Sequence, residues 1–210
     1  MYTGIVQAVA EVVAVERQEG LTSLTLNLAA PLRRDLKQGA SVAVDGVCLS
    51  VVKQTGDHVT FDAMLETLNK TTLGTLEVGH PVNIERSARQ GDEVGGHILS
   101  GHIEGKAQII ALEQSQHNHI ITFQYPFEWQ EYIVHKGFIA INGCSLTVVK
   151  EQEGNTFQVY FIPETLRATT FAHKQIGDEV NIEIDNQTKL IVNTVKRYLS
   201  GLNLTHQSKK

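Results

Sequence analysis

Cys48, His102, Ser145 and Asp185 are the side chains of this chain whose types and positions favour chemistry. Cys48 follows a glycine turn in an alternating segment, where its thiol is either a reactive group or a small buried hydrophobe. His102 follows Gly101, which lets backbone approach a ligand closely, and its imidazole can transfer a proton near neutral pH. Ser145 offers a hydroxyl, and Asp185 offers a carboxylate or a cap for a following helix.

His97 and His102 also raise the question of a metal site. They are five residues apart, and no carboxylate or cysteine stands at ligand spacing beside them. A protein metal site needs three or four such groups at characteristic spacing. We therefore expect no metal.

The elements that must position these groups occur twice in the chain. The segment GVCLSVVK at 46–53 returns as GCSLTVVK at 143–150, and VNIE at 82–85 returns at 180–183. A period just under 100 residues indicates a duplicated domain rather than a solenoid. The copies differ at polar positions that pair as follows: Cys48 with Ser145, Lys136 with Gln38, Asp185 with Ser87, and His102 with a residue near Gly4.

Apolar and polar residues alternate through both copies, as is typical of half-buried strands. Examples are residues 24–28 and 47–51 in the first copy, and 121–125 and 157–161 in the second. About six short strands fit in each copy, and a closed barrel removes the edges that an open sheet exposes. We predict an all-β protein with tandem six-stranded barrels at residues 1–97 and 98–186.

The last segment changes to a helical period. Apolar residues at spacings of three and four predict an amphipathic helix over 187–202, started by Asp185 or Asn186 and ended by Gly201. Its apolar stripe either docks on the chain's own barrel or associates with the same helix of other subunits. Residues 203–210 are polar, and we predict that they are disordered.

Composition narrows the classes of function. The formal net charge is −5, from 18 Lys and Arg against 23 Asp and Glu, which argues against a protein that coats nucleic acid. No apolar run approaches the roughly 20 residues of a membrane-spanning helix, and the N-terminus lacks the layout of a signal peptide. Two cysteines are too few for a disulfide framework. We expect a cytoplasmic protein with no nucleic-acid or membrane partner.

Several motifs in register, from residue 1 to about 200, resemble the riboflavin synthase family, which is built from lumazine-binding repeats. They are MYTGIV at 1–6, GVCLS at 46–50, GGHILSGHI at 95–103, NGCSLTV at 142–148 and IPETL at 162–166. The resemblance implies two Greek-key barrels of six strands and a C-terminal helix that joins three subunits, with active sites shared between subunits.

The resemblance also implies a transferase reaction without metal or cofactor. Two molecules of 6,7-dimethyl-8-ribityllumazine exchange a four-carbon unit and give riboflavin and 5-amino-6-(D-ribitylamino)uracil. A duplicated barrel suits such a reaction, because two similar pockets can hold the two ring systems in opposed orientation. Orientation of this kind contributes about 7–11 kcal/mol. The two molecules play unlike roles, so positions that differ between the copies are the candidates for chemistry.

Residue roles follow from the resemblance. Cys48 adds to substrate C7 or helps water to add, and His102 exchanges a proton with the 7-methyl group. Ser145 offers its hydroxyl to the second lumazine, and Asp185 orients Ser145 or accepts a proton. Lys136 reaches a neighbouring subunit's substrate, although its pattern alone favours a solvated helix end. The expected substrate contacts are Gly4, Ile5, Val6, Cys48, Leu49, Ser50, Asp62, Ala63, Met64, Leu65, Glu66, Thr67, Gly101, His102, Ile103, Lys136, Ser145, Leu146, Thr147, Phe161, Ile162, Pro163, Glu164 and Thr165.

The chain departs from the family pattern at residues 172–174, where AHK replaces a more usual Leu-Gly pattern, and at two single positions. Tyr2 stands where the family usually has Phe, and a buried hydroxyl there needs a hydrogen-bond partner. Asn142 stands where an Asp is often seen.

Other functions fit the sequence less well. A non-catalytic lumazine- or flavin-binding antenna protein shares the fold but lacks reactive side chains at the positions of Cys48 and His102. A flavoprotein reductase needs a Gly-rich strand-to-helix turn, which GGH at 95–97 does not supply. An oligomeric scaffold explains the helix but not the polar residues that differ. Which barrel holds the donor, and whether a lumazine synthase shell encloses the protein, stay open.

Overall fold

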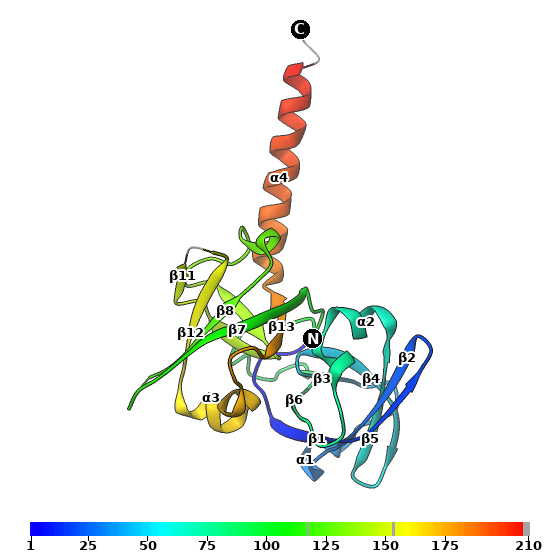
Figure 1. Ribbon diagram of the computed structural model, residues 1–210. Helices are drawn as coiled ribbons and strands as arrows, with labels where there is room; N and C mark the ends of the chain where they lie inside the picture. The colour runs from blue at the N-terminus through cyan, green and yellow to red at the C-terminus, as the bar shows by residue number, and fades with distance from the viewer. Residues whose placement is uncertain (117, 153, 208–210) are drawn as a thin grey trace.

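Two β-barrels lie side by side, and one long helix projects away from them (Figure 1). The computed structural model describes residues 1–116, 118–152 and 154–207. The predicted fold of two duplicated barrels and a C-terminal helix is confirmed.

The first barrel is closed, with antiparallel strands in the order β1-β2-β5-β4-β3-β6. This is a Greek-key order, because the meander of β3, β4 and β5 is flanked by β6 and β2. The strands are β1 (Ala8–Gln18), β2 (Leu21–Asn27), β3 (Ser41–Val44), β4 (Val47–Thr55), β5 (His58–Met64) and β6 (Pro81–Arg86). Short helices join them: α1 (Ala30–Arg33), α2 (Leu65–Lys70) and η1 (Thr72–Thr75).

The second barrel repeats this topology with its fourth strand split in two, so its sheet has seven strands in the order β10-β9-β13-β7-β8-β12-β11. In the first barrel the matching strand β4 is continuous but has a bulge between Val51 and Lys53. At the same place in the second barrel, β10 ends and β11 begins. The elements are β7 (Gly105–Gln114), β8 (His119–Gln124), η2 (Phe127–Trp129), β9 (Phe138–Ile141), β10 (Cys144–Thr147), β11 (Lys150–Gln152), β12 (Thr156–Phe161), α3 (Pro163–Ala168), η3 (Thr170–His173) and β13 (Glu179–Ile184).

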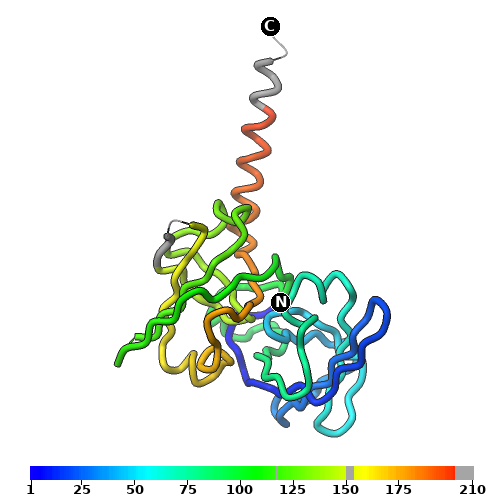
Figure 2. The backbone as a smooth tube through the Cα atoms, viewed as in Figure 1, coloured from blue at the N-terminus to red at the C-terminus, as the bar shows by residue number. Residues whose placement is uncertain are grey.

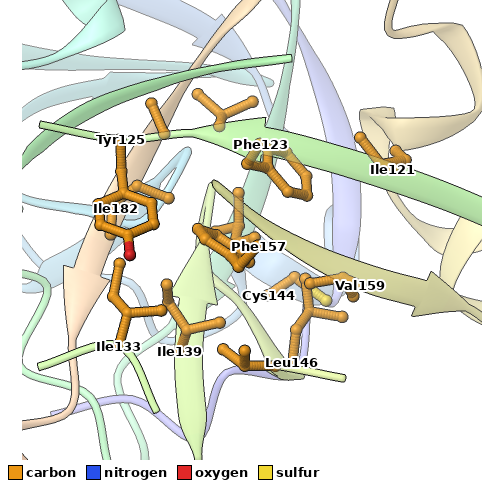
Figure 3. Packing of buried hydrophobic residues seen from close by; sticks show 14 of the residues in the cluster. Ile121, Phe123, Tyr125, Ile133, Ile139, Cys144, Leu146, Phe157, Val159 and Ile182 are labelled. Atoms are coloured by element: carbon orange, nitrogen blue, oxygen red, sulfur yellow. The ribbon is translucent and has the colours of Figure 1, made fainter. Parts of the chain in front are cut away.

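Each barrel encloses its own apolar core, built from the inward positions of the alternating strands. In the first core, Leu24, Leu26 and Phe61 have no exposed surface. In the second, Phe123 and Phe157 stack with ring centroids 5.2 Å apart (Figure 3). Burying one such side chain contributes about 1.5–3 kcal/mol. Because the apolar residues of each strand lie on one face, this energy determines which face turns inward.

The segments that precede the barrels are exchanged between them. Tyr2 and Leu99 pair as a short antiparallel bridge, and the N-terminus lies between the two barrels (Figure 2). From this crossing, Val6 enters the core of the second barrel, and Ile103 enters the core of the first. We call residues 1–6 the first arm and residues 98–103 the second arm. The core of each barrel is therefore completed by a residue of the arm that precedes the other barrel.

Two buried glutamates hold the arms in place. Glu85 accepts hydrogen bonds from the backbone N–H of Thr3 at 2.6 Å and of Gly4 at 3.1 Å. Glu183 accepts the matching bonds from Ser100 at 2.7 Å and from Gly101 at 2.9 Å. Burial raises the pKa of Glu85, and the bonds from the first arm act in the opposite direction. Both arms are thus fixed by the same device.

Two asparagines also join the barrels across the approximate two-fold axis. Asn83 Nδ2 donates to the carbonyl of Asn142 at 3.0 Å, and Asn181 Nδ2 donates to the carbonyl of Asp45 at 2.9 Å. The side chains of Asp45 and Asn142 accept backbone bonds from Asn83 and Asn181 in turn. The two sets of bonds match each other. They differ in the accepting side chain, which is the carboxyl of Asp45 in the first barrel and the amide of Asn142 in the second.

Replacing Asp45 by asparagine is expected to favour the folded protein more at neutral pH than in acid. Burial raises the pKa of Asp45 to about 6 from its ordinary value of 3.8, against the bond from Asn83 and the charge of Lys174. The folded chain therefore holds this proton more tightly than the unfolded chain does. The contribution of Asp45 is full below about pH 4 and is lost as the pH rises through about 6.

The amide introduced by Asp45→Asn would keep the bond from Asn83, as Asn142 keeps its bond from Asn181. Relative to the wild type, we expect the free energy of unfolding of this variant to be about 2 kcal/mol higher at pH 8 than at pH 4, because the cost of the new buried N–H₂, which like Nδ2 of Asn142 lacks a partner among the described residues, is the same at both pH values. Urea unfolding at both pH values measures the difference. An equal change at pH 4 and pH 8 would contradict this account.

The C-terminal helix α4 (Asn186–Gln207) starts as predicted and ends later than predicted. Asp185 caps it, because its Oδ2 accepts bonds from the backbone N–H and the hydroxyl of Thr188, both at 2.8 Å. The predicted end at Gly201 is wrong: the helix continues through it, since one internal glycine costs only about 1 kcal/mol. Residues 203–207, which were predicted to be disordered, lie within the bounds of this helix, and residues 208–210 lie outside the described part of the chain.

The apolar stripe of α4 is not covered by the chain's own barrels. Its members are between 51% and 67% exposed: Leu190, Ile191, Val195, Tyr198 and Leu199. Polar contacts tie the first turns to the second barrel, such as the bond from Tyr132 to Asn193 and the ion pair of Lys196 with Glu131. Docking of the stripe on the chain's own barrel, one of the two destinations left open by the sequence, is thus not seen. Over the described residues, no helix is long and apolar enough to cross a membrane.

Candidate functional site

Two matched backbone positions, Cys48 on β4 and Ser145 on β10, each lie against the arm that crosses from the other barrel. The backbone N–H of Cys48 donates to Gly101 O at 2.9 Å, and that of Ser145 donates to Gly4 O at 2.8 Å. Both glycines have a positive φ, +79° and +76°, and a Cβ on them would fall 2.6 Å and 2.5 Å from the Cβ of the respective partner. The arms therefore approach these two positions as closely as backbone allows.

A cavity of about 260 Å³ opens beside Cys48. It is lined by Val47, Cys48, Glu66, Thr67, Lys70, Thr71, Gly101, His102 and Ile103. Six of these were predicted as substrate contacts from separate parts of the sequence: strand β4, helix α2 and the second arm. The structure therefore brings the predicted thiol and the predicted imidazole to one cavity. His102 is exposed, and Cys48 is half-buried.

The thiol of Cys48 has a hydrogen-bond partner on the first arm. The hydroxyl of Tyr2 donates to Cys48 Sγ at 3.1 Å, and Tyr2 itself is 1% exposed. Burial raises the pKa of Tyr2 far above its usual range, so the phenol keeps its proton. The partner that a buried tyrosine hydroxyl was expected to need is thus the predicted reactive thiol.

Ser145 has a different partner. Its Oγ lies 2.6 Å from His97 Nδ1, and the imidazole stacks on Phe138 with centroids 4.9 Å apart. Nε2 of His97 is buried and has no hydrogen-bond partner among the described residues. Burial lowers the pKa of His97 and the nearby charge of Asp185 raises it, with burial the larger effect. A neutral imidazole at this distance can take the proton of the serine hydroxyl.

His97 was not predicted as a site residue. The sequence carried a signal for it, since it follows two glycines of the GGHILSGHI segment, and position 97 has no counterpart in the first copy. Gly96 leaves room for the approach, because a Cβ there would lie 2.5 Å from the Cβ of Ser145. The pairing itself joins residues 48 positions apart and could be found only from the fold.

Asp185 serves the first of the two purposes that the sequence left open, a cap for the following helix, and its action on Ser145 remains a prediction. Its carboxylate caps α4 through Thr188. The same carboxylate is close enough to His97 for its charge to favour the protonated imidazole. Ser145 and His97 thus form a hydroxyl and a base in hydrogen-bond contact, and Asp185 acts on the base through its charge alone, because Nε2 of His97 has no hydrogen-bond partner among the described residues.

Several predicted contacts have side chains that turn into the barrel cores. These are Leu49, Ala63, Leu146 and Phe161, all less than 10% exposed. Their backbone, rather than their side chains, is what a ligand can meet. Met64, Leu65 and Ile162, in contrast, have side chains that are more than half exposed. The predicted contacts from Pro163 to Thr165 form the first turn of α3, and Thr147 ends β10.

Lys136 lies apart from the Cys48 cavity. It is an exposed residue of the turn before β9, with a φ of +62° and a backbone bond to Val148 O at 2.7 Å. A lysine at this place is directed to solvent unless another chain approaches. Its predicted contact with a neighbouring subunit's substrate remains a prediction.

Cys144 behaves as the core residue that its pattern predicted. It is buried in the second core (Figure 3), and burial raises its pKa to about 12. Both cysteines are free thiols. Cys144 is therefore an internal reference against which the reactivity of Cys48 can be measured.

Comparisons with known proteins match most of the chain. A family model described as the lumazine binding domain matches residues 3–87 and 100–185. The chain is 45% identical over 202 residues to a riboflavin synthase of Escherichia coli (strain K12), covering 96% of this chain and 94% of that protein. Two solved structures are similar in fold: LumP complexed with 6,7-dimethyl-8-(1'-D-ribityl) lumazine (TM-score 0.81, 25% identity) and LumP complexed with riboflavin (TM-score 0.82, 27% identity). Each covers 89% of this chain and 100% of the LumP chain.

Proposed function

This chain belongs to the riboflavin synthase family, and we propose that the two matched positions described above, Cys48 and Ser145, are where it carries out that family's reaction. It is a transferase that moves a four-carbon unit between two molecules of 6,7-dimethyl-8-ribityllumazine. The products are riboflavin and 5-amino-6-(D-ribitylamino)uracil. Each barrel holds one lumazine, since each is one lumazine-binding repeat.

One observation supports the assignment of the chemistry to these positions. Cys48 and Ser145 share a backbone environment, in which a carbonyl of the arm from the other barrel accepts the N–H of each. Their side chains have unlike partners, a phenol for the thiol and an imidazole for the hydroxyl. The two lumazines are identical and need similar binding sites, but one donates the four-carbon unit and the other accepts it, so the reactive groups must differ. The shared backbone environment and the different side-chain partners meet both needs.

At the first site, the thiol and His102 face the cavity together. We assign to Cys48 the addition to C7 of the lumazine, or the activation of water for that addition. We assign to His102 the exchange of a proton with the acidic 7-methyl group, because an imidazole titrates near neutral pH.

At the second site, Ser145 places its hydroxyl toward the other lumazine. His97 takes the hydroxyl proton as the oxygen becomes more nucleophilic or forms a stronger hydrogen bond, and the charge of Asp185 stabilises the imidazolium. Fixing both substrates before these steps contributes about 7–11 kcal/mol.

Incubation with 6,7-dimethyl-8-ribityllumazine alone tests the proposal. We expect one riboflavin for every two lumazines consumed, followed by absorbance and by chromatography of both products. Cys48→Ala and Ser145→Ala should each lower turnover while leaving the unfolding midpoint close to that of the wild type. Full turnover in both variants would remove these positions from the chemistry.

The alternative is a protein that binds lumazine and flavin without turnover, in line with the fold similarity to the LumP complexes. The presence of Cys48, His102 and the Ser145–His97 pair favours the enzyme. The same incubation separates the two, because a binding protein retains the lumazine and yields no riboflavin.

We further propose that the exposed stripe of α4 joins three copies of the chain. A row of five apolar residues, each at least half exposed, on a helix that extends away from the barrels needs a partner with the same chemistry (Figure 1). Three such helices cover one another's stripes. The exposed apolar residues among the predicted substrate contacts, including Met64 and Ile162, would then be covered by barrels of neighbouring chains, which makes each active site a shared one.

Replacing Ile191 and Val195 together by lysine is expected to convert the trimer to single chains. Two buried cations at the contact of three helices cost several kcal/mol, more than the marginal stability of such a contact. Light scattering should show the mass falling from three chains to one chain of 23.2 kDa, with turnover lost in parallel. Ser200→Lys, which adds a lysine at an exposed polar position on the opposite face of the same helix, should leave the mass unchanged. A wild-type protein of one-chain mass would contradict the proposal.

A further inference from the structure

We propose that Tyr2 is a positioning residue for Cys48: its phenol fixes the thiol at the wall of the cavity and stabilises negative charge on the sulfur. The inference rests on the proposed function of that cavity. It concerns a residue that lies behind the site, because Tyr2 is not among the described residues that line the cavity.

The geometry places the sulfur between the phenol and the cavity. Cys48 lines the cavity, and its Sγ accepts the hydrogen bond of the Tyr2 hydroxyl at 3.1 Å. Gly101 packs against both, since a Cβ on it would lie 2.6 Å from Cys48 Cβ and 2.9 Å from Tyr2 Cε2. The first arm, strand β4 and the second arm thus meet at this one contact and leave the thiol little freedom to turn.

The hydrogen bond has a fixed direction. Burial raises the pKa of the Tyr2 phenol, as do the sulfur of Cys48 and the nearby charge of Glu85, and a hydrogen bond with Ser87 acts in the opposite direction with a smaller effect. Tyr2 therefore donates and keeps its proton throughout. A donor strengthens its bond when the acceptor becomes charged, so this phenol stabilises a thiolate more than a thiol.

The hydrogen bond from a buried phenol is present at Cys48 and has no equivalent among the described residues at the matching position, Ser145. Leu99, which pairs with Tyr2 across the axis, has no hydroxyl to offer Ser145. Ser145 has the base His97 instead. A proton donor therefore stands behind the sulfur at the first site, and a proton acceptor stands beside the oxygen at the second. This difference separates two otherwise alike sites.

Alkylation of Cys48 by iodoacetamide tests the proposal on the full chain without any substrate. The variant is Tyr2→Phe, which keeps the buried ring and removes only the donor. We expect Cys48 to react about three- to tenfold more slowly at pH 7 in the variant, because the thiolate is the form that reacts. Mass spectrometry of the peptide that holds Cys48 gives the rate, and the buried Cys144 is the internal reference.

Tyr160→Phe, which removes a hydroxyl from a 45% exposed tyrosine, is the matched control and should leave the rate unchanged. The unfolding midpoint of Tyr2→Phe reports whether the fold is intact. An unchanged or faster alkylation of Cys48 in Tyr2→Phe overturns the proposal, since a merely structural role loosens packing and exposes the thiol. Alkylation needs no turnover, so failure of this inference is distinct from failure of the proposed function, which would appear as absence of riboflavin.

Discussion

Replacing His97 by alanine is expected to lower turnover of the lumazine by a factor of about 10² to 10⁴, the range that a positioned general base contributes. The imidazole is 2.6 Å from the hydroxyl of Ser145 and is held by its stack on Phe138. Without it, no described side chain within hydrogen-bond distance of Ser145 Oγ can take the proton. Steady-state kinetics should show the loss in kcat rather than in KM.

His97→Asn separates proton transfer from orientation. Its amide can occupy the position of Nδ1 and hold the hydroxyl, but it cannot accept the proton. We expect Asn to be as slow as Ala. His80→Ala is the control, since His80 is exposed and bonds only locally, to the backbone N–H of Glu77. If Asn restored most of the rate, His97 would orient Ser145 rather than act as its base.

The dependence of turnover on pH should also show that the reaction needs a neutral His97. Burial lowers the pKa of His97, so the imidazole stays neutral at pH 7 and becomes protonated only below its ordinary range near 6.5. A group whose folded pKa is lowered in this way destabilises the fold as the pH falls. Activity that depends on neutral His97 is therefore full at neutral pH and lost in acid, and His97→Asn should abolish that acid limb.

Gly101→Ala is expected to lower the free energy of unfolding by at least about 3 kcal/mol and to close the first site. A positive φ of +79° is strained for alanine, and the new Cβ would lie 2.6 Å from Cys48 Cβ and 3.0 Å from Cys48 N. Neither neighbour is the far end of a flexible side chain, so the second arm must move. Movement of the arm would draw Ile103 out of the first core.

Gly39→Ala is the matched control for this substitution. Gly39 has almost the same φ, +81°, but a Cβ on it would meet nothing within 4 Å. The control therefore measures the backbone strain alone, about 1–2 kcal/mol. Urea unfolding of the two variants, together with lumazine binding followed by fluorescence, gives the difference. Equal losses in both would mean that close packing of the arm on Cys48 contributes nothing.

The sequence alone predicted much of this framework. The alternating strands and the repeated GVCLSVVK and GCSLTVVK segments predicted both barrels, because inward and outward faces follow directly from period-two patterns. The split of the fourth strand in the second barrel was missed, since nothing in Val148 and Val149 differs from the bulged Val51 and Val52. The end of α4 was also missed, because an isolated glycine weakens a helix without ending it.

The site was predicted in part. Cys48, Gly101 and His102 were expected to act together, and the structure places them around one cavity. The partners that distinguish Cys48 from Ser145 were not predicted, because Tyr2 reaches Cys48 from the first arm and His97 reaches Ser145 from the position just before the second arm. Contacts between segments so distant in sequence leave no periodic trace. The leucines beside Cys48 and Ser145 were assigned to the ligand, although strand alternation turns them inward.

The crossing of the arms has a consequence for how the chain matures as it is synthesised. The first barrel obtains Ile103 only after its last strand has been made, and Val6 waits for a barrel whose strands end near residue 184. The first barrel therefore lacks part of its core until the second arm has left the ribosome, and Val6 of the first arm has no core to enter until the second barrel has formed. Assembly must therefore be late and concerted, and a protease that cuts the connection between the halves should destabilise both at once.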